Sequence, residues 1–153
     1  MRAVLQRVRR AEVSAGDNIC GRCGRGLLIL LGVTHGDTEK DAEVLAKKIA
    51  SHRIFTDEND KLNLSLVDIG GEALVISNFT LYANYRKGNR PDFLDSAKPD
   101  RAMKLYIYFV NVLKEFVKNV EYGAFGEHMK IDAELDGPIT IVMDSEILIK
   151  KSE

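Results

Sequence analysis

An apolar run in the middle of the chain ends in a group of hydrogen-bonding side chains. Residues 73–76 are Ala, Leu, Val and Ile, and the next four are Ser77, Asn78, Phe79 and Thr80. Protein scaffolds commonly present functional groups where a strand ends, so this segment could bind or polarise a substrate. Ser, Asn and Thr also often satisfy neighbouring backbone groups. The pattern alone leaves both interpretations open.

A second candidate segment is the tripeptide Asp136-Gly137-Pro138. Pro138 removes a backbone donor and Gly137 permits unusual torsion angles, so the tripeptide predicts a turn. Only about 5–6% of prolines in folded proteins follow a cis bond, so composition alone favours a trans peptide here.

The two cysteines, Cys20 and Cys23, form a lone Cys-x-x-Cys. A redox motif needs a helix N-terminus to lower the thiol pKa, yet glycines surround this pair and a strand-like run follows. A zinc site needs two further ligands, and the histidines His35, His52 and His128 show no paired spacing. We expect structural cysteines and no metal or cofactor, with a thiol–disulfide enzyme as the competing interpretation.

The charge balance limits the kind of nucleic-acid contact that the chain can make. It carries 22 Lys and Arg against 23 Asp and Glu, a net charge of −1. Sequence-independent binding normally needs a visibly basic domain, whereas contact with only the end of an RNA does not. Basic residues gather at 7–10 and at 86–90, and each cluster alone is typical of solvated surface charge.

The hydrophobic pattern indicates which elements must position these groups. Apolar alternation or continuous apolar runs predict extended segments at 2–8, 11–25, 27–33, 62–66, 73–79, 129–135 and 139–143. Helical spacing predicts helices at 38–51, where Thr38 and Asp41 form a capping box, and from Pro99 to about residue 119. Residues 84–98 are loop-like. The whole chain, 1–153, is expected to be one compact α+β domain, and the lack of a spanning run or signal-peptide core predicts a cytoplasmic protein.

The two candidate segments together resemble signatures of one family. Residues 77–83 (Ser-Asn-Phe-Thr-Leu-Tyr-Ala) are similar to the Ser-Gln-Phe-Thr-Leu signature of the D-aminoacyl-tRNA deacylases. Residues 135–140 (Leu-Asp-Gly-Pro-Ile-Thr) are similar to their Asn-x-Gly-Pro-x-Thr signature. Further matching segments are Gln6-Arg7-Val8, Gly32-Val33-Thr34, Arg53-Ile54-Phe55, Asn63-Leu64-Ser65, Lys87-Gly88 with Arg90-Pro91, and Gly123 with Phe125-Gly126.

Two positions depart from the family signatures. Asn78 stands where Gln is usual, which shortens the side chain but keeps the amide. Leu135 replaces the usual Asn at the start of the second signature and could weaken the hydrogen bonding of the Gly-Pro loop. Since neither departure touches Thr80, Gly137 or Pro138, we expect activity to be retained.

The resemblance implies a homodimer with a barrel-like arrangement of mixed or antiparallel sheets and two main helices. It implies that the Gly137-Pro138 bond is cis and that this loop enters the partner subunit's active site. There its carbonyl oxygens would face the substrate's α-carbon and block an L side chain. Arg7, on the same strand face as Ala3 and Leu5, would hold the loop by hydrogen bonds, as its family counterpart does.

The resemblance also implies the reaction, which is hydrolysis of the ester in D-aminoacyl-tRNA and in Gly-tRNA mischarged on tRNA-Ala. A threonine hydroxyl attacks poorly without a base or an N-terminal amine, and Thr80 is internal with no histidine near it in sequence. We expect backbone N–H groups of residues 77–80 to stabilise the developing charge. Water would attack, assisted by the 2′-hydroxyl, with covalent catalysis by Thr80 as the alternative.

The remaining site residues concern recognition of the tRNA end. Phe79, Phe125 and Met129 are candidate walls around the terminal adenine, with ordinary core packing as the competing interpretation. Lys87 and Arg90 would meet acceptor-stem phosphates. Two other functions stay open: a non-catalytic RNA-binding module, and a paralogue with relaxed stereochemistry and a trans Gly-Pro bond that clears glycine or L-alanine.

Overall fold

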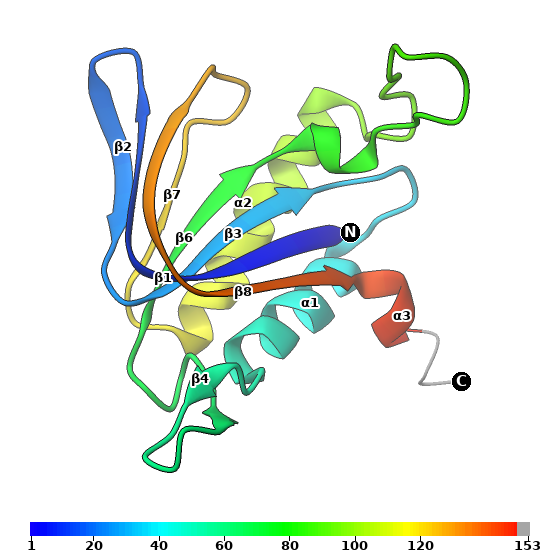
Figure 1. Cartoon of the computed structure of the whole chain (residues 1–153). Helices are drawn as coiled ribbons and strands as arrows, with labels where there is room; N and C mark the ends of the chain where they lie inside the picture. The colour runs from blue at the N-terminus through cyan, green and yellow to red at the C-terminus, as the bar shows by residue number, and fades with distance from the viewer. Residues whose placement is uncertain (150–153) are drawn as a thin grey trace.

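The computed structural model describes residues 1–149 (Figure 1). The elements follow in the order β1 (Arg2–Ala15), β2 (Asn18–Cys23), β3 (Gly26–Gly32), α1 (Glu39–Ser51), β4 (Phe55–Thr56), β5 (Leu62–Leu64), β6 (Glu72–Ser77), the 3₁₀ helix η1 (Phe79–Tyr82), α2 (Pro99–Phe116), β7 (Val120–Tyr122), β8 (Lys130–Asp144) and α3 (Ser145–Ile149).

The long strand β1 organises a mixed six-stranded sheet. Its order is β2-β1-β3-β6-β7, with β8 paired along the other side of β1. β1 is antiparallel to β2, β3 and β8, whereas the β3–β6 and β6–β7 pairs are parallel. The sheet curls strongly, and α1 and α2 cover one of its faces (Figure 1). This arrangement confirms the expected α+β class and its barrel-like sheet.

The core lies between the sheet and the helices α1 and α2. Leu5, Ile29, Leu45 and Phe109 are fully buried there, and each such side chain stabilises the fold by roughly 1.5–3 kcal/mol through the hydrophobic effect. A second buried cluster fills the opposite, concave side of the sheet; its members are Val8, Ala11, Val13, Cys23, Leu28, Leu74 and Ile76. β3 is therefore covered on both faces, as its continuous apolar run predicted.

Both predicted helices are confirmed, and α2 is shorter than expected. Thr38 caps α1 in the predicted capping box, and its backbone N–H donates to the Asp41 carboxylate at 2.9 Å. Pro99 occupies the first turn of α2. The helix ends at Phe116 because Val117 takes an extended conformation, with only 2% of its surface exposed, and leads into β7.

Three predicted strand boundaries are wrong. β1 is one strand through Ala15, where exposed residues at 9 and 10 had suggested a break between two strands. β6 ends at Ser77 rather than Phe79, because the chain turns into η1. β8 is not interrupted at residues 136–138: Gln6 pairs with Thr140 and Val8 with Leu135, so residues 136–139 bulge from a continuous strand. We call these four residues the 136–139 bulge.

None of the helices in residues 1–149 is both long enough and apolar enough to cross a bilayer.

Candidate active site

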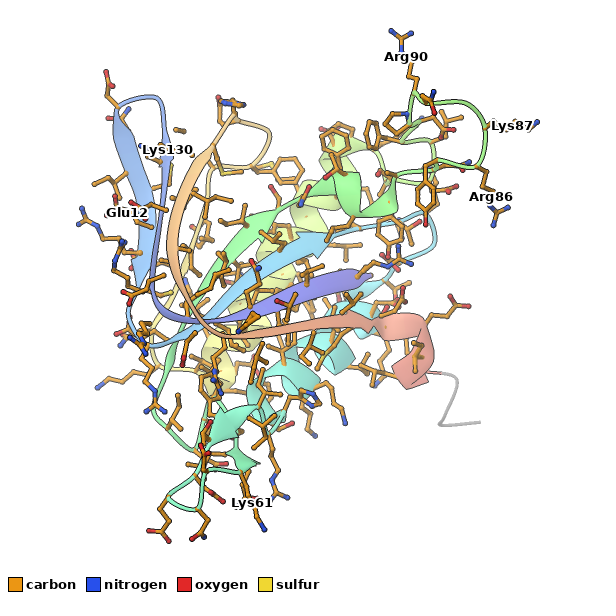
Figure 2. All side chains as sticks on the ribbon, in the orientation of Figure 1. Glu12, Lys61, Arg86, Lys87, Arg90 and Lys130 are labelled. Atoms are coloured by element: carbon orange, nitrogen blue, oxygen red, sulfur yellow. The ribbon has the colours of Figure 1, made fainter. Side chains whose placement is uncertain are left out.

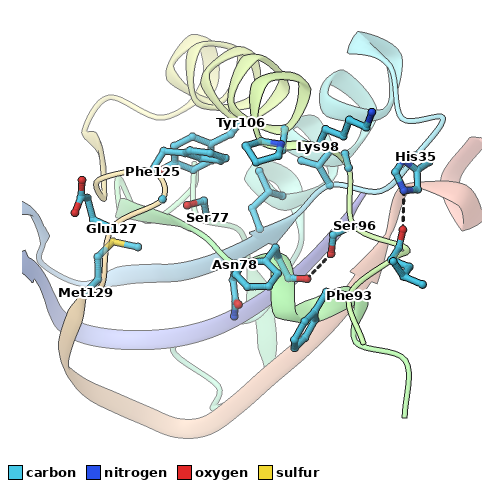
Figure 3. A pocket seen from close by; sticks show the side chains of 18 residues that line it. His35, Ser77, Asn78, Phe93, Ser96, Lys98, Tyr106, Phe125, Glu127 and Met129 are labelled. Atoms are coloured by element: carbon cyan, nitrogen blue, oxygen red, sulfur yellow. Dashed lines mark hydrogen bonds between the residues drawn. The ribbon is translucent and has the colours of Figure 1, made fainter. Parts of the chain in front are cut away.

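A cavity of about 810 Å³ opens where β6 ends (Figure 3). This volume lies in the usual range of small-molecule sites, about 300–1,000 Å³. Its lining comes from the ends of β3 and β6, the start of η1, the 93–98 loop, the first turns of α2 and the 124–129 loop. Five of the sequence-predicted site residues contribute to it: Ser77, Asn78, Phe79, Phe125 and Met129.

The chain leaves the sheet between Asn78 and Thr80. The Asn78 N–H still donates to the Leu31 carbonyl of β3 at 2.8 Å, and a side chain at Gly32 would meet the Asn78 carbonyl oxygen at 3.1 Å. The next two N–H groups, of Phe79 and Thr80, find no hydrogen-bond partner in the described part of the chain. Two adjacent backbone donors are therefore available at the edge of the cavity.

The 93–98 loop holds the Phe79 end of this segment. The Ser96 hydroxyl donates to the Phe79 carbonyl at 2.8 Å, and the Phe93 ring meets the Phe79 ring edge-on with centroids 5.0 Å apart. His35 Nε2 lies 2.7 Å from the Leu94 carbonyl on the same loop. Phe79 itself is 59% exposed, so the interpretation of this ring as core is wrong.

The Thr80 hydroxyl has a neutral partner. It donates a short hydrogen bond to the side-chain oxygen of Asn78, which is an amide and accepts no proton at neutral pH. Thr80 is exposed and is not among the described residues that line the cavity. This environment does not activate the hydroxyl as a nucleophile.

The far wall of the cavity is fixed by a buried tyrosine. The Tyr106 hydroxyl lies 3.0 Å from the Val75 carbonyl and 3.3 Å from that of Gly123. Burial raises the pKa of Tyr106, so its hydroxyl stays protonated and donates. Phe125 packs on the Tyr106 ring at 5.8 Å, and a side chain at Gly123 would meet the Met129 sulfur at 2.8 Å. Phe125 and Met129 thus stand in the cavity wall.

Gly137 and Pro138 lie outside this cavity, on the exposed 136–139 bulge of β8. The peptide bond between them is cis, and Gly137 has a φ of 137°, in the region that favours glycine. Arg7 contacts the bulge one residue earlier than expected: its Nε donates to the Asp136 carbonyl at 3.1 Å. Leu135, beside the bulge, is 49% exposed.

The basic clusters differ in their surroundings. Arg9 and Arg10 form ion pairs with acidic residues of β8. Arg86, Lys87 and Arg90 project from the 85–91 loop (Figure 2) and form no ion pair with residues 1–149. Backbone hydrogen bonds between residues 84 and 92 close the base of this loop. The cluster at 86–90 is therefore the one that offers unpaired positive charge.

Six further cavity residues were missed by the sequence interpretation. They are His35, Phe93, Ser96, Lys98, Tyr106 and Glu127. Tyr106 occupies an apolar position of the predicted α2 stripe, where it could not be told from core. The others lie on loops whose approach to the cavity depends on the fold, and no local pattern marks them.

Cys20 and Cys23 are free thiols on β2. Burial raises the pKa of Cys23 to about 11, which makes this thiol unreactive at neutral pH. Among residues 1–149, no group of three His, Cys, Asp or Glu side chains is placed to hold a metal ion.

The chain was compared with known families, proteins and structures. The sequence profile of the D-Tyr-tRNA(Tyr) deacylase family matches residues 4–144. A D-aminoacyl-tRNA deacylase of Thermosipho melanesiensis is 52% identical over 147 residues, covering 95% of this chain and 98% of that protein. One of Persephonella marina is 51% identical over 148 residues, covering 97% and 100%. A solved structure titled c-Myc DNA Unwinding Element Binding Protein superposes with a TM-score of 0.88 at 37% identity, covering 94% of this chain and 98% of that one.

Proposed function

The chain belongs to the D-Tyr-tRNA(Tyr) deacylase family, and we propose that it hydrolyses the ester bond that joins a D-amino acid to the 3′ end of tRNA. The observation that carries this proposal is the pair of unpartnered N–H groups of Phe79 and Thr80 at the edge of a nucleoside-sized cavity. Preorganised donors of this kind stabilise the negative charge that develops when an ester carbonyl is attacked.

The reaction needs little further machinery. A water oxygen adds to the ester carbonyl carbon, the bond to the ribose oxygen breaks, and that oxygen takes up a proton. The neighbouring 2′-hydroxyl of the substrate can assist this proton transfer. Thr80, bonded to the neutral Asn78 amide, keeps the segment in shape rather than attacking the ester.

The cavity would hold the terminal adenosine. Phe79, Phe125 and Met129 supply apolar surface on its walls, and aromatic stacking on a base contributes about 1–3 kcal/mol. The ester would then lie at the rim, beside the N–H groups of Phe79 and Thr80.

Handedness would be enforced by the 136–139 bulge of a second subunit. The bulge is exposed, stands on the edge strand β8 and lies outside the cavity of its own chain, so a homodimer would let it reach the partner's site. An apolar pocket separates similar groups by only about 1–3 kcal/mol. A wall of main-chain atoms from Gly137 and Pro138 would instead exclude an L side chain by overlap, while glycine on tRNA-Ala, with no side chain, would be accepted.

Lys87 and Arg90 would contact phosphates of the acceptor stem. Both are exposed and unpaired among the described residues, and Figure 2 shows them at the tip of a projecting loop. Contact with one end of the tRNA is compatible with a net charge of −1.

Deacylation of matched D-Tyr-tRNA, L-Tyr-tRNA and Gly-tRNA-Ala by the purified protein tests the proposal. We expect turnover of the first and third and protection of the second. Binding without turnover would indicate an RNA-binding module. Equal rates on the D and L esters would indicate a paralogue with relaxed stereochemistry, and would refute the proposed role of the bulge.

A further inference from the structure

Arg7 is fixed by groups from two separate parts of the chain. Its guanidinium, on a side chain only 10% exposed, makes four polar contacts. On the bulge, Nε lies 3.1 Å from the Asp136 carbonyl and 3.2 Å from the Asp136 carboxylate. On the other side, Nη1 donates to the Ile54 carbonyl at 3.1 Å and to the Thr56 hydroxyl at 3.2 Å. A single cation therefore bridges β8 and the start of the β4–β5 hairpin.

The hairpin side of this bridge is rigid. The two groups that contact Nη1 flank Phe55, which is 1% exposed in the main core, and Ile54 is 4% exposed. Phe55 pairs with Leu64, and the Arg53 Nε donates to the Asn63 carbonyl at 2.7 Å, which closes the hairpin near its base. Because buried, paired backbone moves little, Nη1 is held on a fixed support.

The bulge side has no comparable support from the sheet. Residues 136–139 face β1 only at Arg7, since the pairing on either side resumes at Thr140 and Leu135. Figure 1 shows β4 directly beneath the bend of β8. The Arg7 guanidinium is thus what ties the carbonyl before Gly137 to the core.

We infer that Thr56 and the Asp136 carboxylate are positioning residues for chiral selection, which act through Arg7 by bracing the 136–139 bulge against the β4–β5 hairpin. This inference rests on the proposed function of the bulge. Hydrogen bonds to a charged group are stronger than neutral ones and directional. Removing either partner leaves the guanidinium freer to move, and the Gly137-Pro138 wall with it.

The matched variants are Thr56→Val, which keeps the shape and removes the hydroxyl, and Asp136→Asn, which keeps the size and removes the charge. Asp132→Asn is the control for the second, because Asp132 also lies on β8 and pairs with an arginine of β1, Arg10, at 3.2 Å, away from the bulge. Thr56→Ser restores the hydroxyl. We expect Thr56→Val and Asp136→Asn to lower the ratio of kcat/KM for D-Tyr-tRNA over L-Tyr-tRNA by about tenfold, and the two controls to leave it unchanged.

Two further measurements separate positioning from general destabilisation. In an Arg7→Lys background, whose ammonium cannot make these contacts together, Thr56→Val should have no additional effect on the ratio. Hydrogen exchange of the peptide covering residues 135–140 should be faster in Thr56→Val and Asp136→Asn than in wild type or Asp132→Asn.

The outcomes are distinguishable. A wild-type protein without D-Tyr-tRNA hydrolysis refutes the proposed function, while the exchange data still report whether the brace exists. A D-selective wild type whose ratio survives both variants overturns the inference, and so does an equal loss in Asp132→Asn. Faster exchange with an unchanged ratio also overturns it, because a loosened bulge would then leave handedness intact.

Discussion

Replacing Thr80 by alanine distinguishes chemistry by the side chain from chemistry by the backbone. The Thr80 hydroxyl is exposed and donates to the neutral Asn78 amide. A hydrogen bond of this kind contributes about 0.5–1.5 kcal/mol, and ~1.4 kcal/mol corresponds to a tenfold change in rate. The backbone N–H of residue 80 survives the substitution. We therefore expect Thr80→Ala to lower kcat/KM for D-Tyr-tRNA by no more than about tenfold.

The assay is single-turnover hydrolysis with enzyme in excess over D-Tyr-tRNA, followed by acid quench. Thr80→Ser is the control, because it keeps the hydroxyl and removes a methyl group. Loss of a true nucleophile costs on the order of 10⁶ in kcat, as in serine proteases. A fall of that size in Thr80→Ala with an active Thr80→Ser, or an acyl-enzyme recovered from the quench, would refute the backbone mechanism.

Three further predictions concern the cavity, the basic loop and the buried thiol. Tyr106→Phe should lower the free energy of unfolding by about 1 kcal/mol and Tm by roughly 2–4 °C, and should raise KM because the 124–129 loop loosens; an unchanged KM would contradict the assigned wall. Lys87→Ala with Arg90→Ala should lower the salt dependence of KM by up to about 0.7–0.9 in log–log slope per phosphate contact, whereas Lys61→Ala, on the distant hairpin tip in Figure 2, should not. The Cys23 pKa rises from 9.0 to about 11 on folding, so the folded state keeps a proton that the unfolded state loses, and this contribution is full below pH 9 and lost towards pH 11. Cys23→Ala should lack this part of the pH dependence in chemical denaturation.

Local patterns predicted the elements that bury one face or both. The helix at 38–51 and the strand at 27–33 agree with α1 and β3 to within two residues, because apolar spacing and the Thr38 cap act locally. The errors fall where tertiary pairing overrides a local signal. Residues 136–138 look like a turn, yet β1 holds both flanks in one continuous strand.

The candidate site was predicted where its chemistry is local to one segment. Ser77 to Phe79 line the cavity as expected, because a strand that ends in polar residues opens at the sheet edge. Ser96 was not predicted, since its contact with the Phe79 carbonyl joins a loop and a strand end that only the fold brings together. The bracing of Arg7 by Thr56 was missed for the same reason: nothing near position 56 indicates that it will face β1.

The pairing of β1 with β8 has a consequence for how the chain folds. Residue 2 lies opposite residue 144, and residue 14 opposite residue 130, so the first strand made is the last to gain its partner. Contacts of such long sequence separation require large loops to close, and they slow folding relative to helical proteins of similar size. During synthesis β1 can pair with β2 and β3 early, while its other edge stays open until residue 144 has left the ribosome. An unpaired edge of this length is prone to pair with another chain, so we expect a chain cut before residue 130 to aggregate where the longer chain stays dispersed.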